Sequence, residues 1–252
     1  MRIAVIGAGV MGSGMAQVLA QAGHEVHGTD VAEAAIAKAR DRVTTGRYGF
    51  DRAVERGKLS RADADAALAR LRFSTDFEGA VGAADLVVEA VPEQLDLKIR
   101  VFRRLDGLAK PDCILASNSS GFPLAALASA TDRPSRVIVW HWASPPAVMK
   151  FAEIVVRPET DAGVVETVKR LATECGKRPV VVKDNPMAWG YVANRVYAAM
   201  LQEASRVVAE GTASHAEVNQ LMVDCFGWPV GPFAMVEGAS KGFSEGGGGS
   251  PS

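Results

Sequence analysis

Short apolar segments alternate with longer amphipathic segments along most of this chain. The apolar segments are rich in Val and Ile, as is typical of buried parallel strands, and the amphipathic segments have helical spacing. Strands that alternate with helices predict an α/β fold with a doubly wound sheet. The predicted strands are 3–6, 25–30, 85–90, 112–117, 136–140, 151–156 and 179–183. The predicted helices between them are 10–20, 95–108, 122–130 and 160–175.

Two parts of the chain depart from this alternation. An inserted helical hairpin over 32–72 has predicted helices at 32–45 and 60–72, and from Gly190 onward the pattern is helical only, with Ser214 as a predicted N-cap. The helices expected in that last part are 191–210 and 214–225. We therefore predict an α/β domain over 1–186, a small, shortened all-α domain over 187–245, and a Gly-rich flexible tail over 246–252.

A glycine-rich turn joins the first predicted strand to the first predicted helix. It reads Gly7-Ala8-Gly9-Val10-Met11-Gly12. In such a turn Gly7 allows the tight bend, Gly9 lets the backbone approach a pyrophosphate, and Gly12 lets helix and strand pack closely. The helix N-terminus at Val10 and Met11 adds free N–H groups and a positive dipole end. The turn predicts a dinucleotide site in a Rossmann-type sheet, whereas an ordinary βα turn is the less favoured interpretation.

An acid at the end of the second predicted strand indicates which dinucleotide binds. Asp30 stands where a carboxylate can accept hydrogen bonds from the adenosine ribose hydroxyls. A ribose 2′-phosphate would face this negative charge, and residues 31–37 hold no Arg or Lys to compensate. The sequence therefore predicts NAD as the cofactor in preference to NADP.

Charge and cysteine content narrow the classes of partner. The net charge is -1 and there is no basic tail, so we expect neither nucleic acid nor a membrane as a partner. The first strand leaves no room for a signal peptide, and no apolar stretch has spanning length. Cys113, Cys175 and Cys225 are widely spaced among apolar residues, so we expect reduced, buried thiols in a cytoplasmic protein and no metal site.

A histidine and a glutamate stand on neighbouring predicted strands. His141 directly follows the strand 136–140, at the edge where open α/β sheets bind ligands, and Glu153 interrupts the apolar strand 151–156. A carboxylate in such a strand is costly without a partner. If the two side chains meet, Glu153 fixes the tautomer of His141 and leaves the other ring nitrogen to act as a general base. A purely structural His–Glu hydrogen bond is an equal alternative at this point.

The motifs together resemble the L-3-hydroxyacyl-CoA dehydrogenase family from residue 1 to about 236. The nucleotide turn, the His141–Glu153 separation and their order along the chain match that family. The other matching motifs are Glu89-Ala-Val-Pro-Glu93 with Lys98, Ala116-Ser117-Asn118-Ser119-Ser120, Gly190-Tyr-Val-Ala-Asn194-Arg195 and Gly231-Pro232-Phe233.

The resemblance implies NAD-dependent oxidation of an L-3-hydroxyacyl-CoA to the 3-ketoacyl-CoA, and the reverse reaction. It implies that His141 and Glu153 form a catalytic dyad and that Ser120 and Asn194 hydrogen-bond the substrate oxygens. Glu93, Lys98 and Ser120 would lie along the nicotinamide half of NAD.

A local excess of positive charge is the feature that favours a CoA ester. Residues 38–72 hold ten Lys and Arg residues against five Asp and Glu residues. The 3′-phosphate and pyrophosphate of coenzyme A suit such a hairpin, although a solvated helical hairpin would look similar.

Three departures from the family keep other functions open. Ser144, an expected cofactor contact with a shorter reach, stands where relatives usually have Asn. Met187-Ala188-Trp189 is an insertion, and the helical domain is short where relatives have further helices that dimerise. We therefore expect at most a weak homodimer. One alternative is a dehydrogenase of a free 3-hydroxy acid, similar to those for L-carnitine or L-gulonate. The other is an NAD(H)-binding protein without turnover.

Overall fold

The computed structural model describes residues 1–244, which divide into two compact units, Met1–Tyr191 and the part from Val192 onward. The predicted domain boundary after residue 186 falls in the segment just before this division. The predicted Gly-rich tail over 246–252 lies outside the described residues.

An eight-stranded sheet forms the centre of the first unit. Its order is β3-β2-β1-β4-β5-β6-β7-β8, and every neighbouring pair is parallel except β6 and β7, which are antiparallel. This arrangement confirms the doubly wound Rossmann-type sheet. The strands are β1 (Arg2–Ile6), β2 (Glu25–Thr29), β3 (Leu71–Ser74), β4 (Leu86–Glu89), β5 (Ile114–Ser117), β6 (Val137–Trp142), β7 (Phe151–Val156) and β8 (Arg178–Lys183).

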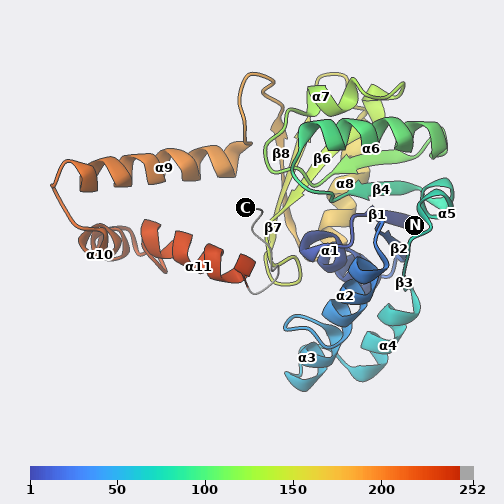
Figure 1. The fold of residues 1–252 in the computed structure, drawn as a ribbon, viewed down its shortest axis with the longest axis horizontal. Coiled ribbons are helices and arrows are strands. Elements are labelled where there is room, and N and C mark those ends of the chain that lie inside the picture. Colours follow the sequence, from blue (N-terminus) through green and yellow to red (C-terminus); the bar gives the residue numbers. More distant parts are fainter. Residues whose placement is uncertain (245–252) are drawn as a thin grey trace. The chain divides into compact units, whose positions relative to one another are not determined.

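Helices cover both faces of this sheet (Figure 1). One buried apolar cluster joins α1, α2 and α8 to one face, and a second joins α5, α6 and α7 to the other. Strand residues alternate between the two clusters, as the pleat requires. The helices are α1 (Val10–Gln21), α2 (Glu33–Thr44), α3 (Phe50–Glu55), α4 (Arg61–Ala69), α5 (Phe77–Ala83), α6 (Leu95–Leu108), α7 (Leu124–Ala128), the 3₁₀ turn η1 (Pro134–Arg136) and α8 (Ala162–Glu174).

The inserted hairpin differs from the prediction at its end. The predicted helix 60–72 is wrong beyond Ala69, because Leu71–Ser74 pairs with β2 as the edge strand β3. The Phe73 side chain is buried there, and a Cβ on Gly28 of β2 would lie 2.3 Å from its ring. Pairing with a strand distant in sequence therefore overrides the local helical pattern. Helices α3 and α5 were not predicted.

The second unit is helical, as predicted, and contains α9 (Val192–Ala209), α10 (His215–Phe226) and α11 (Pro232–Ser244). Ser214 caps α10 in a capping box with Glu217, which confirms the predicted N-cap. Helix α11 was not predicted, and Asn219 of α10 accepts hydrogen bonds from the amides of Phe233 (2.9 Å) and Ala234 (3.4 Å) at its start. Within residues 1–244, no helix is both long and apolar enough to cross a membrane.

The cysteine prediction is partly wrong. Cys113 is buried and Cys175 is partly buried, and burial raises the pKa of Cys113 to about 11 and that of Cys175 to about 12. Cys225 is exposed, because α10 buries Val218 and leaves the residues around Cys225 exposed or partly exposed.

Candidate active site

The glycine-rich turn connects β1 to α1 and has the backbone that its sequence predicts. Gly7 has φ of +98°, and a Cβ on it would lie 2.6 Å from the Ala90 carbonyl oxygen. A Cβ on Gly12 would lie 1.8 Å from the Gly7 carbonyl oxygen. A Cβ on Gly9 would meet nothing within 4 Å. The turn is therefore closed beneath Gly7 and Gly12 and open above Gly9, where a pyrophosphate needs room.

The N-terminus of α1 borders this open space. The helix starts at Val10, with Gly9 as its N-cap, so the amides of Val10, Met11 and Gly12 have no helical carbonyl to bind. Arg42 of α2 donates to the Ala8 carbonyl at 3.2 Å and holds the turn from the other side. The turn thus offers N–H donors and a positive dipole end to an anion.

Asp30 lies beside a hollow that fits an adenosine. Its Oδ2 atom accepts from the Ala8 amide at 2.8 Å, which fixes the carboxylate against the turn. The hollow measures about 750 Å³ and its walls include Gly7, Asp30, Phe77 and Val91. The walls are mostly apolar, with Arg100 and Arg104 at their polar part and Asp30 as their carboxylate. These residues fit the adenosine of NAD.

Glu93, Lys98 and Ser120 contact one another in the structure. Lys98 of α6 lies 3.2 Å from Glu93, and Glu93 accepts from the Ser120 amide at 2.9 Å and from the Ser119 hydroxyl at 2.6 Å. These contacts join the end of β4 to the loop after β5. Parallel strands bring both ends to the carboxyl edge of the sheet, where the glycine-rich turn also lies.

Glu89 organises this cluster and was missed as a site residue. Its side chain is fully buried, and it accepts from Lys98 Nζ at 2.7 Å, from the Ser117 hydroxyl at 2.6 Å and from the Val91 amide at 2.8 Å. Burial raises the pKa of Glu89, whereas Lys98 and the three hydrogen bonds favour its charged form. The signal that singled out Glu153, an acid in an apolar strand, also applies to Glu89.

His141 and Glu153 face one another across the antiparallel strands β6 and β7. They are register partners, and His141 Nδ1 lies 3.0 Å from Glu153 Oε2. His141 is 6% exposed and Glu153 4% exposed. His141 was expected directly after a strand, but β6 continues to Trp142 because its pairing with β7 extends past the predicted end.

The pair leaves one imidazole nitrogen available for chemistry. A carboxylate can only accept, so Nδ1 carries the proton and Nε2 is the acceptor in the neutral ring. The rings of Phe151 and Tyr191 lie beside the imidazole, with their centroids 5.2 Å and 5.8 Å from the centroid of the His141 ring. Asn118 accepts from the Trp142 amide at 2.9 Å and so ties β6 to the loop that holds Ser120. The arrangement can hold a general base at a fixed angle.

Two other predicted site residues lie outside the strands that carry the dyad. Ser144 is exposed in the connection between β6 and β7. Asn194 lies on α9, in the second unit. Both assignments stay predictions.

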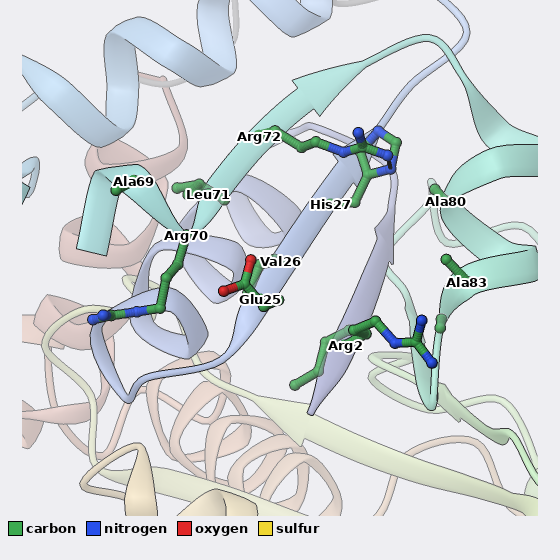
Figure 2. A pocket seen from close by; sticks show the side chains of 12 residues that line it. Arg2, Glu25, Val26, His27, Ala69, Arg70, Leu71, Arg72, Ala80 and Ala83 are labelled. Atoms are coloured by element: carbon green, nitrogen blue, oxygen red, sulfur yellow. Dashed lines mark hydrogen bonds between the residues drawn. The ribbon is translucent and has the colours of Figure 1, made fainter. Parts of the chain in front are cut away.

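A separate hollow of about 270 Å³ lies at the amino ends of β1, β2 and β3, the opposite edge of the sheet from the glycine-rich turn (Figure 2). His27 lines it beside Arg72, but both ring nitrogens are engaged, Nδ1 with Arg72 at 2.8 Å and Nε2 with Ser74 at 2.6 Å. No group of three His, Cys, Asp or Glu residues within the described range could hold a metal ion. The candidate chemistry thus stays at the carboxyl edge.

Comparison with known proteins agrees with this geometry. Residues 2–185 match the family model described as 3-hydroxyacyl-CoA dehydrogenase, NAD binding domain, and residues 190–243 match the C-terminal domain of the same family. The chain belongs to the 3-hydroxyacyl-CoA dehydrogenase family. Members of this family are NAD-dependent oxidoreductases, so the chain is an enzyme of that class with NAD as its cofactor.

This chain is similar to several kinds of family member over most of their length. A 5-formyl-3-hydroxy-2-methylpyridine 4-carboxylate 5-dehydrogenase of Mesorhizobium japonicum is 37% identical, over 91% of this chain and 70% of that protein. A probable 3-hydroxybutyryl-CoA dehydrogenase of Bacillus subtilis is 36% identical, over 94% of this chain and 80% of that protein. The crystal structure of an (S)-3-hydroxybutyryl-CoA dehydrogenase from Ralstonia eutropha superposes with a TM-score of 0.87 at 35% identity, covering 92% of this chain and 80% of that one.

Proposed function

We propose that this chain interconverts an L-3-hydroxyacyl-CoA and the corresponding 3-ketoacyl-CoA, with NAD as the hydride acceptor and donor. The observation that carries the proposal is the buried contact of 3.0 Å between His141 Nδ1 and Glu153 Oε2. It stands on the sheet whose carboxyl edge holds the glycine-rich turn. Membership of the family supports the same reaction.

The dyad moves the proton of the reaction. Bound NAD supplies the acceptor for the hydride that leaves C3 of the substrate. His141 Nε2 takes the proton of the 3-hydroxyl group, and Glu153 stabilises the imidazolium that forms. In the reducing direction His141 returns this proton to the oxygen. Burial of both side chains keeps bulk water from competing for the proton.

Neighbouring residues orient cofactor and substrate in this proposal. Ser120 donates to the substrate oxygen and polarises the 3-keto group, and Asn194 assists from α9. Glu93 and Lys98 line the nicotinamide side, where Glu89 holds the Lys98 ammonium in place. Ser144 reaches the cofactor from the connection between β6 and β7.

The helical hairpin would recognise the phosphates of coenzyme A. Part of its positive charge is already used within the fold, since Arg40, Arg42 and Arg70 donate to the backbone carbonyls of Phe73, Ala8 and Ala20. Lys38, Arg56 and Lys58 are exposed. These exposed side chains are the ones we assign to the phosphates.

A second candidate is a dehydrogenase of a free acid. One relative is named for a pyridine carboxylate rather than a CoA ester. The inserted Trp189 also lies against the loop that holds Ser120. Its indole is so close to Gly121 that a Cβ added to this glycine would lie 2.5 Å from the ring. An indole in this place can replace part of the volume that a thioester would occupy.

The deciding experiment follows NADH consumption by absorbance with acetoacetyl-CoA, longer 3-ketoacyl-CoAs and free 3-keto acids. Turnover that requires the thioester supports the first candidate, and turnover of the free acids supports the second. Tight NADH binding without turnover of any substrate would contradict both and favour a binding protein. We assign the enzyme to the cytoplasm because its three cysteines are free thiols, which suit a reducing compartment.

A further inference from the structure

Lys177 has an unusual environment for a lysine. It lies in the turn between α8 and β8, and the residue is only 7% exposed. Its ammonium donates to the carbonyl oxygens of Pro146 and of Met149, the latter at 2.8 Å. It also lies 4.4 Å from the centroid of the Trp142 ring. Burial lowers the pKa of Lys177.

This buried cation has no carboxylate partner among residues 1–244. The nearby Glu174 is paired with Arg170 at 2.8 Å and with His24 at 3.3 Å instead. A buried ammonium without a counter-ion is costly, so its compensation must come from carbonyl dipoles and an aromatic face. All of these groups belong to Trp142, the last residue of β6, and to residues 143–150, the segment that connects β6 to β7.

That segment joins the two strands of the dyad. It begins after Trp142, two residues beyond His141, carries Ser144, and leads into β7 with Glu153. Several of its side chains are exposed, including Val148 (55%) and Met149 (40%). Apolar burial therefore does little to hold residues 147–150. They are held by the contacts with Lys177, by the hydrogen bond from the Arg178 amide to the Lys150 carbonyl at 2.7 Å, and by hydrogen bonds within the turn.

The opposite side of the segment touches the nucleotide-binding helix. A Cβ on Gly14 of α1 would lie 3.0 Å from Pro146 Cγ, so the Pro146 ring rests directly on the helix backbone. Lys177 binds the carbonyl oxygen of the same proline. The segment is thus held between Lys177 and α1, the helix that begins at the glycine-rich turn.

We propose that Lys177 is a positioning residue for the cofactor: its ammonium holds residues 143–150 against α1. This contact keeps Ser144 and His141 at a fixed distance from the nicotinamide. The proposal rests on the roles given above to these two residues. Lys177 itself touches neither substrate nor cofactor.

The test compares Lys177→Met, which keeps the length and removes the charge, with Lys177→Arg, which restores the charge. Lys169→Met is the matched control, because Lys169 is a partly exposed lysine of α8 whose ammonium pairs with Glu166 at the surface. Three quantities are measured: the NADH dissociation constant by titration, kcat and KM with acetoacetyl-CoA, and the rate of tryptic cleavage after the exposed Lys150.

Lys177→Met should raise the NADH dissociation constant at least about tenfold, lower kcat by a similar factor, and leave the KM for acetoacetyl-CoA nearly unchanged. Cleavage after Lys150 should be several-fold faster, because the segment opens more often. Lys177→Arg should partly restore the NADH dissociation constant, kcat and the cleavage rate, and Lys169→Met should match wild type in all three. A role in stability alone would lower the melting temperature without changing NADH affinity or cleavage in the folded enzyme.

If Lys177→Met binds NADH and is cleaved like wild type, the proposal is wrong. If this variant does not fold, Gly14→Ala tests the segment from the other side, since the added Cβ displaces Pro146. The ring must shift by only a few tenths of an ångström, so we expect a smaller rise in the NADH dissociation constant and in the cleavage rate, and wild-type values would overturn the proposal. NADH binding and cleavage need no acyl-CoA, so failure of the proposed reaction in wild type is separately visible.

Discussion

At the scale of single residues, the buried acids of this enzyme are the most informative positions. Glu153 and Glu89 each interrupt an apolar strand, and each has a buried cationic or imidazole partner in the structure. An isolated carboxylate could not stay charged there. The two acids have different partners, because Glu153 contacts the imidazole of His141 whereas Glu89 accepts hydrogen bonds from Lys98 and Ser117.

The dyad predicts a specific pattern of lost activity. His141→Gln should lower kcat by about 10²-fold or more and leave NADH affinity nearly unchanged, because the imidazole acts in the transition state. Glu153→Gln should also lower kcat, since the amide no longer fixes the imidazole. The double variant should be little slower than His141→Gln, as the two side chains act as one unit. Steady-state kinetics check this, and near-wild-type turnover of His141→Gln would show that the pair is structural.

Asp30 predicts the cofactor preference. NADH should bind at least about tenfold more tightly than NADPH, because the carboxylate binds the ribose hydroxyls and repels a 2′-phosphate. Asp30→Ala should narrow this gap by weakening NADH binding. Fluorescence titration with both nucleotides measures the gap, and equal dissociation constants for wild type would contradict the assignment.

At the scale of elements, the pairing of β2 with β3 places a histidine where it resists protonation. Burial, followed by the charge of Arg72, lowers the pKa of His27, whereas Asp76 acts in the opposite direction. The unfolded chain therefore binds more protons than the folded one below about pH 6.5, so the free energy of unfolding falls as pH drops through this range.

Urea unfolding at pH 7.5 and pH 5.5 tests this effect. Wild type should lose stability at the lower pH, and His27→Gln should lose less. His24 contributes in the same direction, because burial and the N-terminal charge lower its pKa. His215→Gln, on the exposed start of α10, is the control and should keep the wild-type difference. An unchanged difference in His27→Gln would contradict the prediction.

At the scale of the whole molecule, exposed apolar side chains on the second unit predict weak self-association. Val196 (66%), Leu221 (61%) and Phe226 (63%) are exposed on α9 and α10. Burial of such side chains against another copy is favourable. We expect a concentration-dependent dimer that dissociates at low micromolar concentration, and Phe226→Ser should weaken it. Light scattering over a concentration series measures this, with Met187→Ser as control, and a dimer that persists throughout would contradict it.

The sequence by itself determined most of the local elements, the glycine-rich turn and the family. Strand and helix periodicity reports which side of each element is buried, so the α/β order could be predicted without any tertiary contact. The turn at Gly7, Gly9 and Gly12 is equally local, because its requirement is backbone space and a positive φ. The spacing of His141 and Glu153 identified the candidate dyad through the same local information and the family resemblance.

Only the tertiary structure decided features that depend on partners distant in sequence. The antiparallel pairing of β6 with β7 extended the strand past His141 and put it opposite Glu153. Likewise, residues 71–74, predicted as the end of a helix and the residues after it, pair with β2 as the strand β3. The side chain of Asn219 accepts a hydrogen bond at the start of α11, a helix that was not predicted. The anchoring of residues 143–150 by Lys177 has no signal in the sequence around that lysine. Register, capping and ion pairing over such separations depend on which surfaces meet in the folded chain, and local periodicity does not encode that.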